Sequence, residues 1–149
     1  MNTPDLSILI VEDEPIDAEL LQRAFKRVGL ENPVRWVMNG EEAVSYMQGK
    51  GDYKDRSKHP YPRVIMTDIK MPQMDGLEFL RWMHETPQFR VVPIIILTSS
   101  ARQADIDEAF KYGASAFMVK PIGLYELDRL VKLIVDYWSA SKLPGLISQ

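Results

Sequence analysis

Polar residues that could do chemistry lie at the ends of four apolar runs of the chain. Glu12 and Asp13 follow the first of these runs, Asp68 follows another, Thr98 ends a third, and Lys120 follows the last. If the runs are parallel strands of one sheet, their carboxyl ends meet at one edge, where open α/β sheets bind ligands. Asp68 alone would equally fit a strand terminator, because Asp is a common turn residue. The coincidence at four runs, in complementary chemical types, favours a site.

These residue types suit phosphoryl chemistry on a carboxylate. Crowded carboxylates cannot all ionise cheaply unless a cation lies among them, and oxygen ligands suit Mg²⁺ (or Mn²⁺). A carboxylate beside a metal can act as a nucleophile toward phosphorus, which is the role predicted for Asp68. The hydroxyl of Thr98 and the ammonium of Lys120 could then hold the phosphoryl oxygens. The pattern predicts an aspartyl-phosphate site.

The elements that must position these residues alternate along the chain. Apolar runs predict buried strands at 8–11, 34–38, 64–68, 93–98 and 116–119. Helices are expected from Pro15, after Asn39, from Asp75-Gly76, after Ser100, and from Leu124 to Trp138. The predicted fold class is therefore α/β: a flavodoxin-like, doubly wound, five-stranded parallel sheet of order 2-1-3-4-5, with helices on both faces.

The 149 residues are expected to form one domain, residues 1–149, with its core at about 6–138. Residues 49–63 are predicted to be an extended polar loop, because roughly 2–6 residues usually suffice between a helix and a strand. Residues 139–149 are predicted to be a C-terminal tail.

Composition and charge exclude several functions. The net charge of −3 gives no general attraction to nucleic acid or to an anionic membrane. The chain has no cysteine, which excludes disulfides, thiol nucleophiles and thiolate metal sites. The first residues lack a signal-peptide pattern, and no segment reaches the roughly 20 apolar residues of a membrane span. We therefore expect a cytoplasmic protein that binds neither nucleic acid nor membrane.

The quoted residues, in this strand context, resemble the receiver domain of bacterial two-component response regulators over about residues 6–138. The resemblance implies that Asp68 accepts a phosphoryl group from the phosphohistidine of a histidine kinase. It implies that Thr98 and Lys120 bind this group. It also implies that the chain is no enzyme toward other molecules and catalyses only its own phosphorylation and slow acyl-phosphate hydrolysis.

The same resemblance assigns the metal ligands. Asp13 and Asp68 would bind Mg²⁺ directly, together with the backbone carbonyl of Lys70. Glu12 would bind it through water.

A switch and one peptide geometry are implied as well. Thr98 and Phe117 would be the switch residues, with Phe117 moving inward after phosphorylation. The Lys120–Pro121 bond would be cis, a geometry found almost only before proline.

The extended loop and the short chain resemble the small regulators partnered with cyanobacterial and other bacterial phytochromes. The implied partners are a sensor histidine kinase, with a bacterial phytochrome as one form of it, and a downstream protein or phosphotransfer partner. No output domain is expected after the last helix, so a stand-alone receiver is predicted.

The last predicted helix carries more apolar residues than one buried stripe requires. Leu133 and Tyr137 lie beside the predicted buried stripe, which consists of Leu127, Leu130, Val131, Ile134 and Trp138. We hypothesise that the excess forms a partner or homodimer face with the fifth strand. The alternative is a wider core stripe that the tail partly covers.

Three other functions compete with a receiver. Haloacid-dehalogenase-type phosphatases place a second Asp two residues after the nucleophile, but Lys70 follows Asp68 and Pro15 follows Asp13 at that spacing. A nucleotide-binding module of this fold would need a Gly-x-Gly-x-x-Gly or Walker pattern, and neither occurs. A receiver-like scaffold that takes no phosphate is disfavoured by the complete acceptor set.

Overall fold

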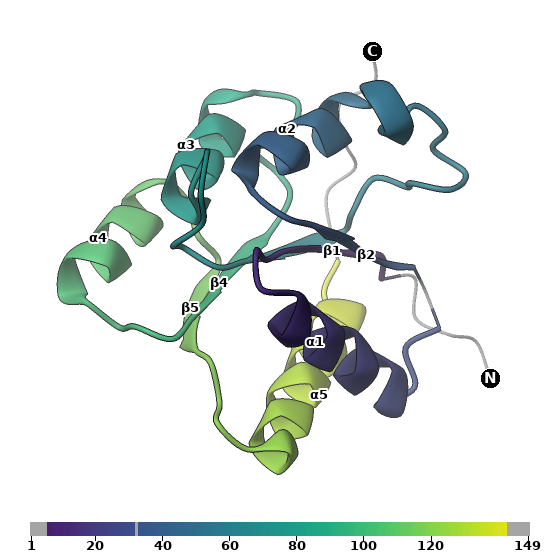
Figure 1. The fold of residues 1–149 in the computed structure, drawn as a ribbon, viewed down its shortest axis with the longest axis vertical. Coiled ribbons are helices and arrows are strands. Elements are labelled where there is room, and N and C mark those ends of the chain that lie inside the picture. Colours follow the sequence, from purple (N-terminus) through teal and green to yellow (C-terminus); the bar gives the residue numbers. More distant parts are fainter. Residues whose placement is uncertain (1–5, 32, 143–149) are drawn as a thin grey trace.

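The computed structural model describes residues 6–31 and 33–142. These residues form five strands and five α-helices in strict alternation, with one 3₁₀ turn (Figure 1). The elements are β1 Ile8–Val11, α1 Pro15–Arg27, β2 Val34–Val37, α2 Gly40–Gln48, η1 Gly51–Tyr53, β3 Val64–Thr67, α3 Gly76–Glu85, β4 Ile94–Thr98, α4 Gln103–Lys111, β5 Ala116–Val119 and α5 Leu124–Ala140.

All neighbouring strands are parallel, and their order is β2-β1-β3-β4-β5. This confirms the predicted flavodoxin-like topology. The register pairs Val11 with Thr67 and Thr98 with Val119, so the strands end nearly level with one another. The polar residues that follow them therefore start from one edge of the sheet.

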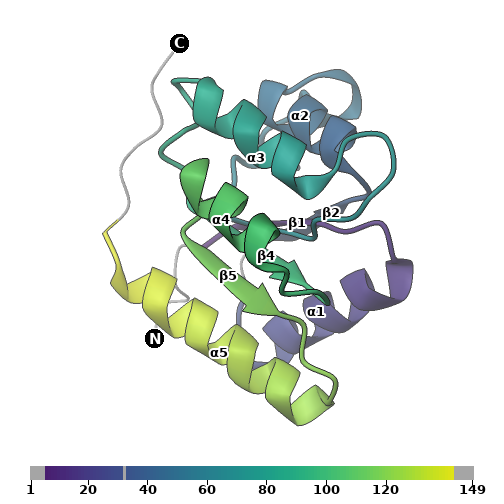
Figure 2. The ribbon, with the colours of Figure 1, turned by 90° about the vertical axis from the view of Figure 1, so that its left-hand side faces the viewer.

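The sheet separates two apolar cores. Helices α1 and α5 cover one face, and α2, α3 and α4 cover the other (Figures 1 and 2). Successive strand residues alternate between these cores: Leu9 of β1 packs toward α2–α4, whereas Ile8 and Ile10 pack toward α1 and α5. Burial on both faces explains why the strands read as unbroken apolar runs.

Two helices begin where the predicted caps place them. Asp75 accepts from the backbone N–H of Glu78 at 2.8 Å, and the Glu78 carboxylate accepts from the Asp75 N–H at 3.1 Å, a complete capping box. Asn39 accepts from the Glu42 N–H at 2.9 Å. The Glu42 carboxylate instead accepts from the hydroxyl of Tyr53 at 3.0 Å, so it holds the following loop.

The loop at 49–63 is packed by its own side chains. The guanidinium of Arg56 lies 4.0 Å from the ring centroid of Tyr61. It donates to the carbonyls of Tyr46 and Met47 at 2.6 and 2.9 Å, which satisfies the C-terminal end of α2. In the structure these residues connect α2 to β3, with η1 as a short turn among them.

Helix α5 extends two residues beyond the predicted end, to Ala140. The predicted tail therefore begins later than expected, and residues 143–149 lie outside the described part of the chain. Among the helices described, none combines the length and the apolar character that a membrane span would need.

Gly76 lets the start of α3 pack directly against the end of β3. A Cβ at this position would lie 1.9 Å from the carbonyl oxygen of Asp68. We expect Gly76→Ala to lower the free energy of unfolding by about 1–3 kcal/mol, as overpacking does, measured by urea denaturation. The matched control is Gly123→Ala, where the added Cβ meets only the movable carboxylate of Glu126. An equal loss in both variants would contradict this reading.

Candidate functional site

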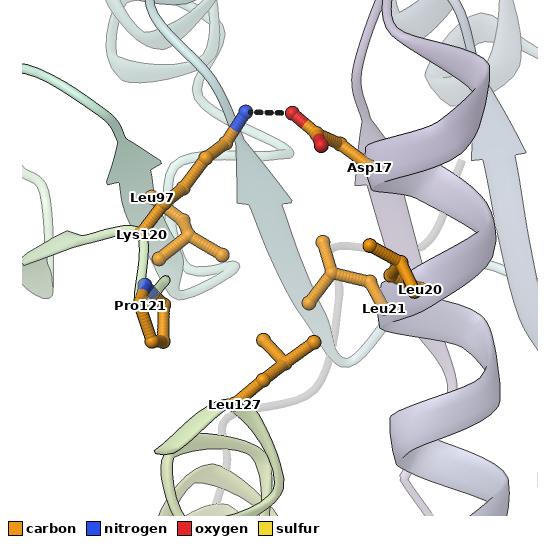
Figure 3. A pocket seen from close by; sticks show the side chains of 7 residues that line it. All are labelled: Asp17, Leu20, Leu21, Leu97, Lys120, Pro121 and Leu127. Atoms are coloured by element: carbon orange, nitrogen blue, oxygen red, sulfur yellow. Dashed lines mark hydrogen bonds and ion pairs between the residues drawn. The ribbon is translucent and has the colours of Figure 1, made fainter. Parts of the chain in front are cut away.

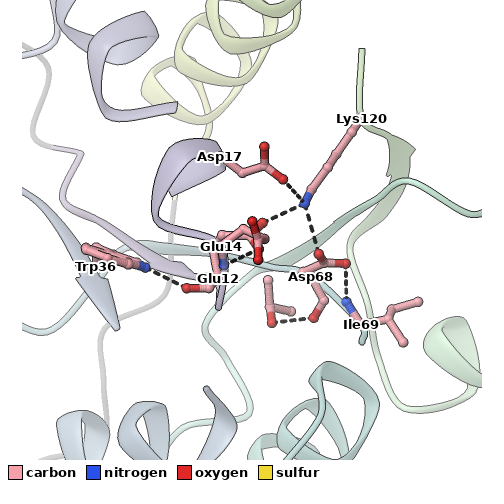
Figure 4. A network of polar contacts seen from close by, with 8 residues as sticks. Glu12, Glu14, Asp17, Trp36, Asp68, Ile69 and Lys120 are labelled. Carbon is pink, nitrogen blue, oxygen red and sulfur yellow. Dashed lines mark hydrogen bonds and ion pairs between the residues drawn. The ribbon is translucent and has the colours of Figure 1, made fainter. Parts of the chain in front are cut away.

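The ammonium of Lys120 joins the ends of three elements at the carboxyl edge of the sheet. Its Nζ donates to Glu12 Oε1 at 2.6 Å, to Asp68 Oδ2 at 2.9 Å and to Asp17 Oδ2 at 2.9 Å (Figure 4). Glu12 follows β1, Asp68 follows β3, and Lys120 follows β5. The structure therefore brings together residues that lie far apart in the sequence, as the strand-end pattern predicted.

Asp68 is held in a fixed orientation. Its Oδ1 accepts from the backbone N–H of Ile69 at 2.7 Å, while Oδ2 faces Lys120. Its carbonyl oxygen accepts from the hydroxyl of Thr67 at 2.8 Å. The side chain is 11% exposed, so the carboxylate is sheltered yet open to a reactant.

Three carboxylates form a cluster suited to a divalent cation. Oxygen atoms of Glu12, Asp13 and Asp68 lie within 4.8 Å of one another. A set of carboxylate oxygens with no sulfur or imidazole is the donor chemistry that Mg²⁺ and Mn²⁺ favour. These residues fit the predicted metal. Lys70 lies two residues after Asp68, and the role of its carbonyl as a ligand stays a prediction.

The two predicted switch residues lie on neighbouring strands, β4 and β5. Thr98 is buried at the end of β4, and its carbonyl accepts from the backbone N–H of Lys120 at 2.8 Å. Phe117, on β5, is half-buried and packs against the core between the sheet and α2–α4. Their movement on phosphorylation stays a prediction.

The predicted cis bond between Lys120 and Pro121 is wrong. No peptide bond within residues 6–31 and 33–142 is cis. The trans form is favoured before proline by about 0.5–1 kcal/mol. From this trans bond the Lys120 side chain already reaches all three carboxylates, so no contact of the site requires the cis form.

Sequence reasoning missed two contributors to the site. Asp17 lies in the first turn of α1 and contacts Lys120 at 2.9 Å. The indole N–H of Trp36, on β2, donates to the carbonyl of Glu12 at 2.7 Å. The position of Asp17 in the first turn of the helix that starts just after Asp13 was the available signal. Trp36 carried no signal, because its partner is a backbone atom.

Burial and charge perturb the two most enclosed groups. Burial raises the pKa of Glu12 to about 7, although hydrogen bonds from Lys120 and from the Glu14 backbone oppose the shift. Burial would lower the pKa of Lys120, but hydrogen bonds to Glu12, Asp68 and Asp17 outweigh it and raise the Lys120 pKa above its ordinary value. The cluster therefore holds excess negative charge beside one firmly protonated lysine, a setting that a divalent cation would stabilise.

Comparison with known proteins agrees with this geometry. Residues 8–132 match the response regulator receiver domain family. The chain is 30% identical over 139 residues to the probable methanogenesis regulatory protein FilR2 of Methanothrix harundinacea, covering 93% of this chain and 87% of that protein. It is 26% identical over 137 residues to the response regulator Rcp1 of a Synechocystis strain, covering 92% and 91% of the two chains.

Solved structures of response regulators share the fold. The phosphorylated cyanobacterial phytochrome response regulator RcpA superposes with a TM-score of 0.85 at 28% identity, over 94% of this chain and 99% of that one. The Mn²⁺-bound form of Rcp1 gives a TM-score of 0.83 at 26% identity, over 94% and 99%.

The sheet order, the acidic cluster and the strand-end lysine define a receiver-type α/β domain. The family match covers most of the chain, and the chain belongs to the response regulator receiver domain family. It is accordingly a response regulator of two-component signalling, similar to the response regulator Rcp1 and to the cyanobacterial phytochrome response regulator RcpA. The related Rcp1 structure holds Mn²⁺, and the three clustered carboxylates of this chain fit a divalent metal.

The raised pKa of Glu12 predicts how the stability of the metal-free protein depends on pH. Between about pH 4.5 and pH 7 the folded state binds a proton on Glu12 that the unfolded state has lost, so this group lowers the free energy of unfolding as pH rises. Glu12→Gln removes this pH-dependent loss of stability. Relative to the parent chain, the variant should gain stability across this range, by at most about 3 kcal/mol, in urea denaturation with chelator.

The control is Glu41→Gln, which neutralises an exposed acid on α2. Its stability relative to the parent should stay nearly constant over the same range. A flat difference for Glu12→Gln would contradict a raised pKa.

Proposed function

We propose that Asp68 accepts a phosphoryl group from the phosphohistidine of a histidine kinase, in a Mg²⁺-dependent reaction, and that the phosphorylated domain signals through protein–protein contacts. One observation supports this above the others. The ammonium of Lys120 lies 2.9 Å from an oxygen of Asp68, beside the acidic cluster. A nucleophile, a cation site and a positive charge for phosphoryl oxygens thus occupy one place.

The proposed transfer uses Asp68 Oδ2 as the nucleophile. Its O–P bond forms while the P–N bond to the donor imidazole breaks, and the imidazole nitrogen keeps the bonding pair and takes up a proton. Oδ1 keeps its bond from the N–H of Ile69, which fixes the carboxyl group during attack. Oδ2 faces a flexible lysine side chain whose ammonium can shift to the new phosphoryl oxygens.

Two further groups complete the proposed site. The hydroxyl of Thr98 would donate to a phosphoryl oxygen, with Lys120 as the opposing charge. Glu12, Asp13, Asp68 and the Lys70 carbonyl would hold the metal, Glu12 through water. When bound, the cation would offset the negative charge that accumulates as the phosphoryl group approaches.

The proposed chemistry serves signalling rather than turnover. The acyl phosphate on Asp68 would hydrolyse slowly, and no other molecule would be a substrate. A phosphatase of the haloacid-dehalogenase type would need a general acid two residues after the nucleophile. Lys70 at that position cannot take this role as a carboxylic acid would.

A kinase must reach Asp68 from the open edge of the sheet. Two exposed apolar side chains flank that edge: Ile16 beside Asp17, and Ile122 two residues after Lys120. We propose that they contact the kinase, since exposed apolar side chains near a site suit protein docking. The likeness to Rcp1 and RcpA supports a bacterial phytochrome as the kinase and the cytoplasm as the location.

The output surface proposed here is the exposed part of β5 and α5. Leu133 and Tyr137 are each 63% exposed on α5, and Val119 is half-exposed on the edge strand β5. A helix that covers one sheet face needs only one apolar stripe. We propose that this excess binds a partner, with a second copy of the chain as the occupant in the absence of other proteins.

Phosphorylation at Asp68 is tested with acetyl phosphate and Mg²⁺, read by intact mass. One phosphoryl adduct is expected on the parent chain and none on Asp68→Asn, because the amide cannot form the acyl phosphate. Asp75→Asn is the matched control, since Asp75 caps α3 rather than entering the site, and it should still be phosphorylated. If neither acetyl phosphate nor a cognate kinase gave an adduct, the scaffold interpretation would replace the proposal.

Dimerisation is tested by sedimentation velocity at high protein concentration, with and without beryllofluoride as a phosphoryl mimic. We expect a dimer that the mimic strengthens, and a monomer for Leu133→Glu, because a charge on the apolar face opposes its burial. Lys132→Ala, a neighbouring exposed change, should leave the dimer intact. A single monomeric species for the parent chain under both conditions would count against the second copy.

A further inference from the structure

Asp17 differs from the other acids around Lys120. It comes from α1 rather than from a strand end, and it is not part of the carboxylate trio that fits a cation. Its side chain is 41% exposed, yet its Oδ2 lies 2.9 Å from Lys120 Nζ. The contact between Asp17 and Lys120 therefore needs an explanation other than metal binding.

The ammonium has three donors, and each of them faces a different carboxylate. Two of these acceptors have a second duty in the proposed reaction. Glu12 belongs to the metal cluster, and Asp68 Oδ2 is the proposed nucleophile. Asp17 is the one acceptor of the three that neither metal binding nor phosphoryl transfer claims.

On the side of Lys120 that faces α1, the described residues around its aliphatic side chain offer the ammonium no polar partner besides Asp17. A small pocket of about 50 Å³ lies beneath the Asp17–Lys120 pair (Figure 3). Apart from that pair, its described lining is apolar: Leu20, Leu21, Leu97, Pro121 and Leu127. Without Asp17 the long, flexible lysine side chain would gain rotamer freedom over an apolar surface.

The element that carries Asp17 is itself fixed. Helix α1 packs against α5, and Arg27 at its end forms a bidentate bridge to Asp128 of α5, with a shortest distance of 2.7 Å. Positioning groups work best on rigid elements. Asp17 therefore holds Lys120 from a helix that does not depend on the occupancy of the site.

We propose that Asp17 is the positioning residue of Lys120: it keeps the ammonium over Asp68 while the metal engages the acidic trio and the phosphoryl group arrives. This inference rests on the proposed phosphorylation of Asp68. Its consequence is kinetic, since a prepositioned charge speeds the transfer without adding a metal ligand.

The experiment compares Asp17→Ala, Asp17→Asn and the parent chain. The rate of phosphorylation by acetyl phosphate, followed by intact mass, should fall about three- to tenfold in Asp17→Ala, the scale of one hydrogen bond at a partly exposed, screened position. Asp17→Asn keeps an acceptor oxygen and should lie in between. The Mg²⁺ dissociation constant, from calorimetry, should stay within about twofold, because Asp17 is no ligand. The Lys120 ¹³Cε–¹Hε NMR signal of the metal-free protein should move in Asp17→Ala.

Glu19→Ala is the matched control, because Glu19 is an exposed acid of the same helix that pairs only with Arg23 among the contacts described. It should match the parent in every measurement. A phosphorylation rate that stays unchanged or rises in Asp17→Ala would overturn the proposal. So would a fall in rate that is accompanied by weaker Mg²⁺ binding, or an equal fall in Glu19→Ala. If the parent chain itself takes no phosphate, the phosphorylation proposal fails. If the Lys120 NMR signal is the same in Asp17→Ala and the parent chain, only the positioning role of Asp17 is refuted.

Discussion

One ammonium held among three carboxylates is the interaction on which the site depends. Among the ion pairs described, Lys120 is the cation that offsets part of the charge that Glu12, Asp17 and Asp68 bring to one edge of the sheet, with Asp13 close by. A single positive charge cannot balance four acids. Burial adds to this cost, because it raises the pKa of Glu12 to about 7, and the nearby charge of Asp68 acts in the same direction. This imbalance gives the site an affinity for a divalent cation before any reactant is present.

The sheet supplies the geometry that makes this crowding possible. Because the strands are parallel, their carboxyl ends lie at one edge of the sheet, and the loops that follow three of them open there. The β3–α3 connection then folds back so closely that only a glycine fits at position 76, against the carbonyl of Asp68. The orientation of the nucleophile thus depends on the packing of α3 as much as on its hydrogen bonds.

The fold and the strand-end residues could be predicted from the sequence because both follow from the pattern of apolar residues and from the parallel order of the strands. A buried parallel strand reads as an apolar run, and the residue after it must lie at the ligand-binding edge. The position of Asp17 depends instead on how α1 packs against α5, which no strand-end pattern encodes. The prediction of a cis Lys120–Pro121 bond was wrong. It was inferred from a resemblance, and no local sequence pattern determines the isomer of the bond before a proline. The Arg56 stacking in the 49–63 loop was invisible for a related reason, since it joins residues by shape rather than by spacing.

The same lysine also links the site to the surface proposed for output. Its backbone N–H donates to the carbonyl of Thr98 at 2.8 Å, so Lys120 extends the β4–β5 pairing at one end while its side chain reaches the acids. A phosphoryl group adds about −1.5 to −2 charge at Asp68, and the ammonium must redistribute its donors in response. Under the proposed phosphorylation, a shift of the chain at Lys120 would be passed to Val119 before it, an exposed residue of the surface proposed for output. Lys120 would in that case couple charge at the sheet edge to shape at the β5–α5 face, which is the physical requirement for a phosphorylation switch.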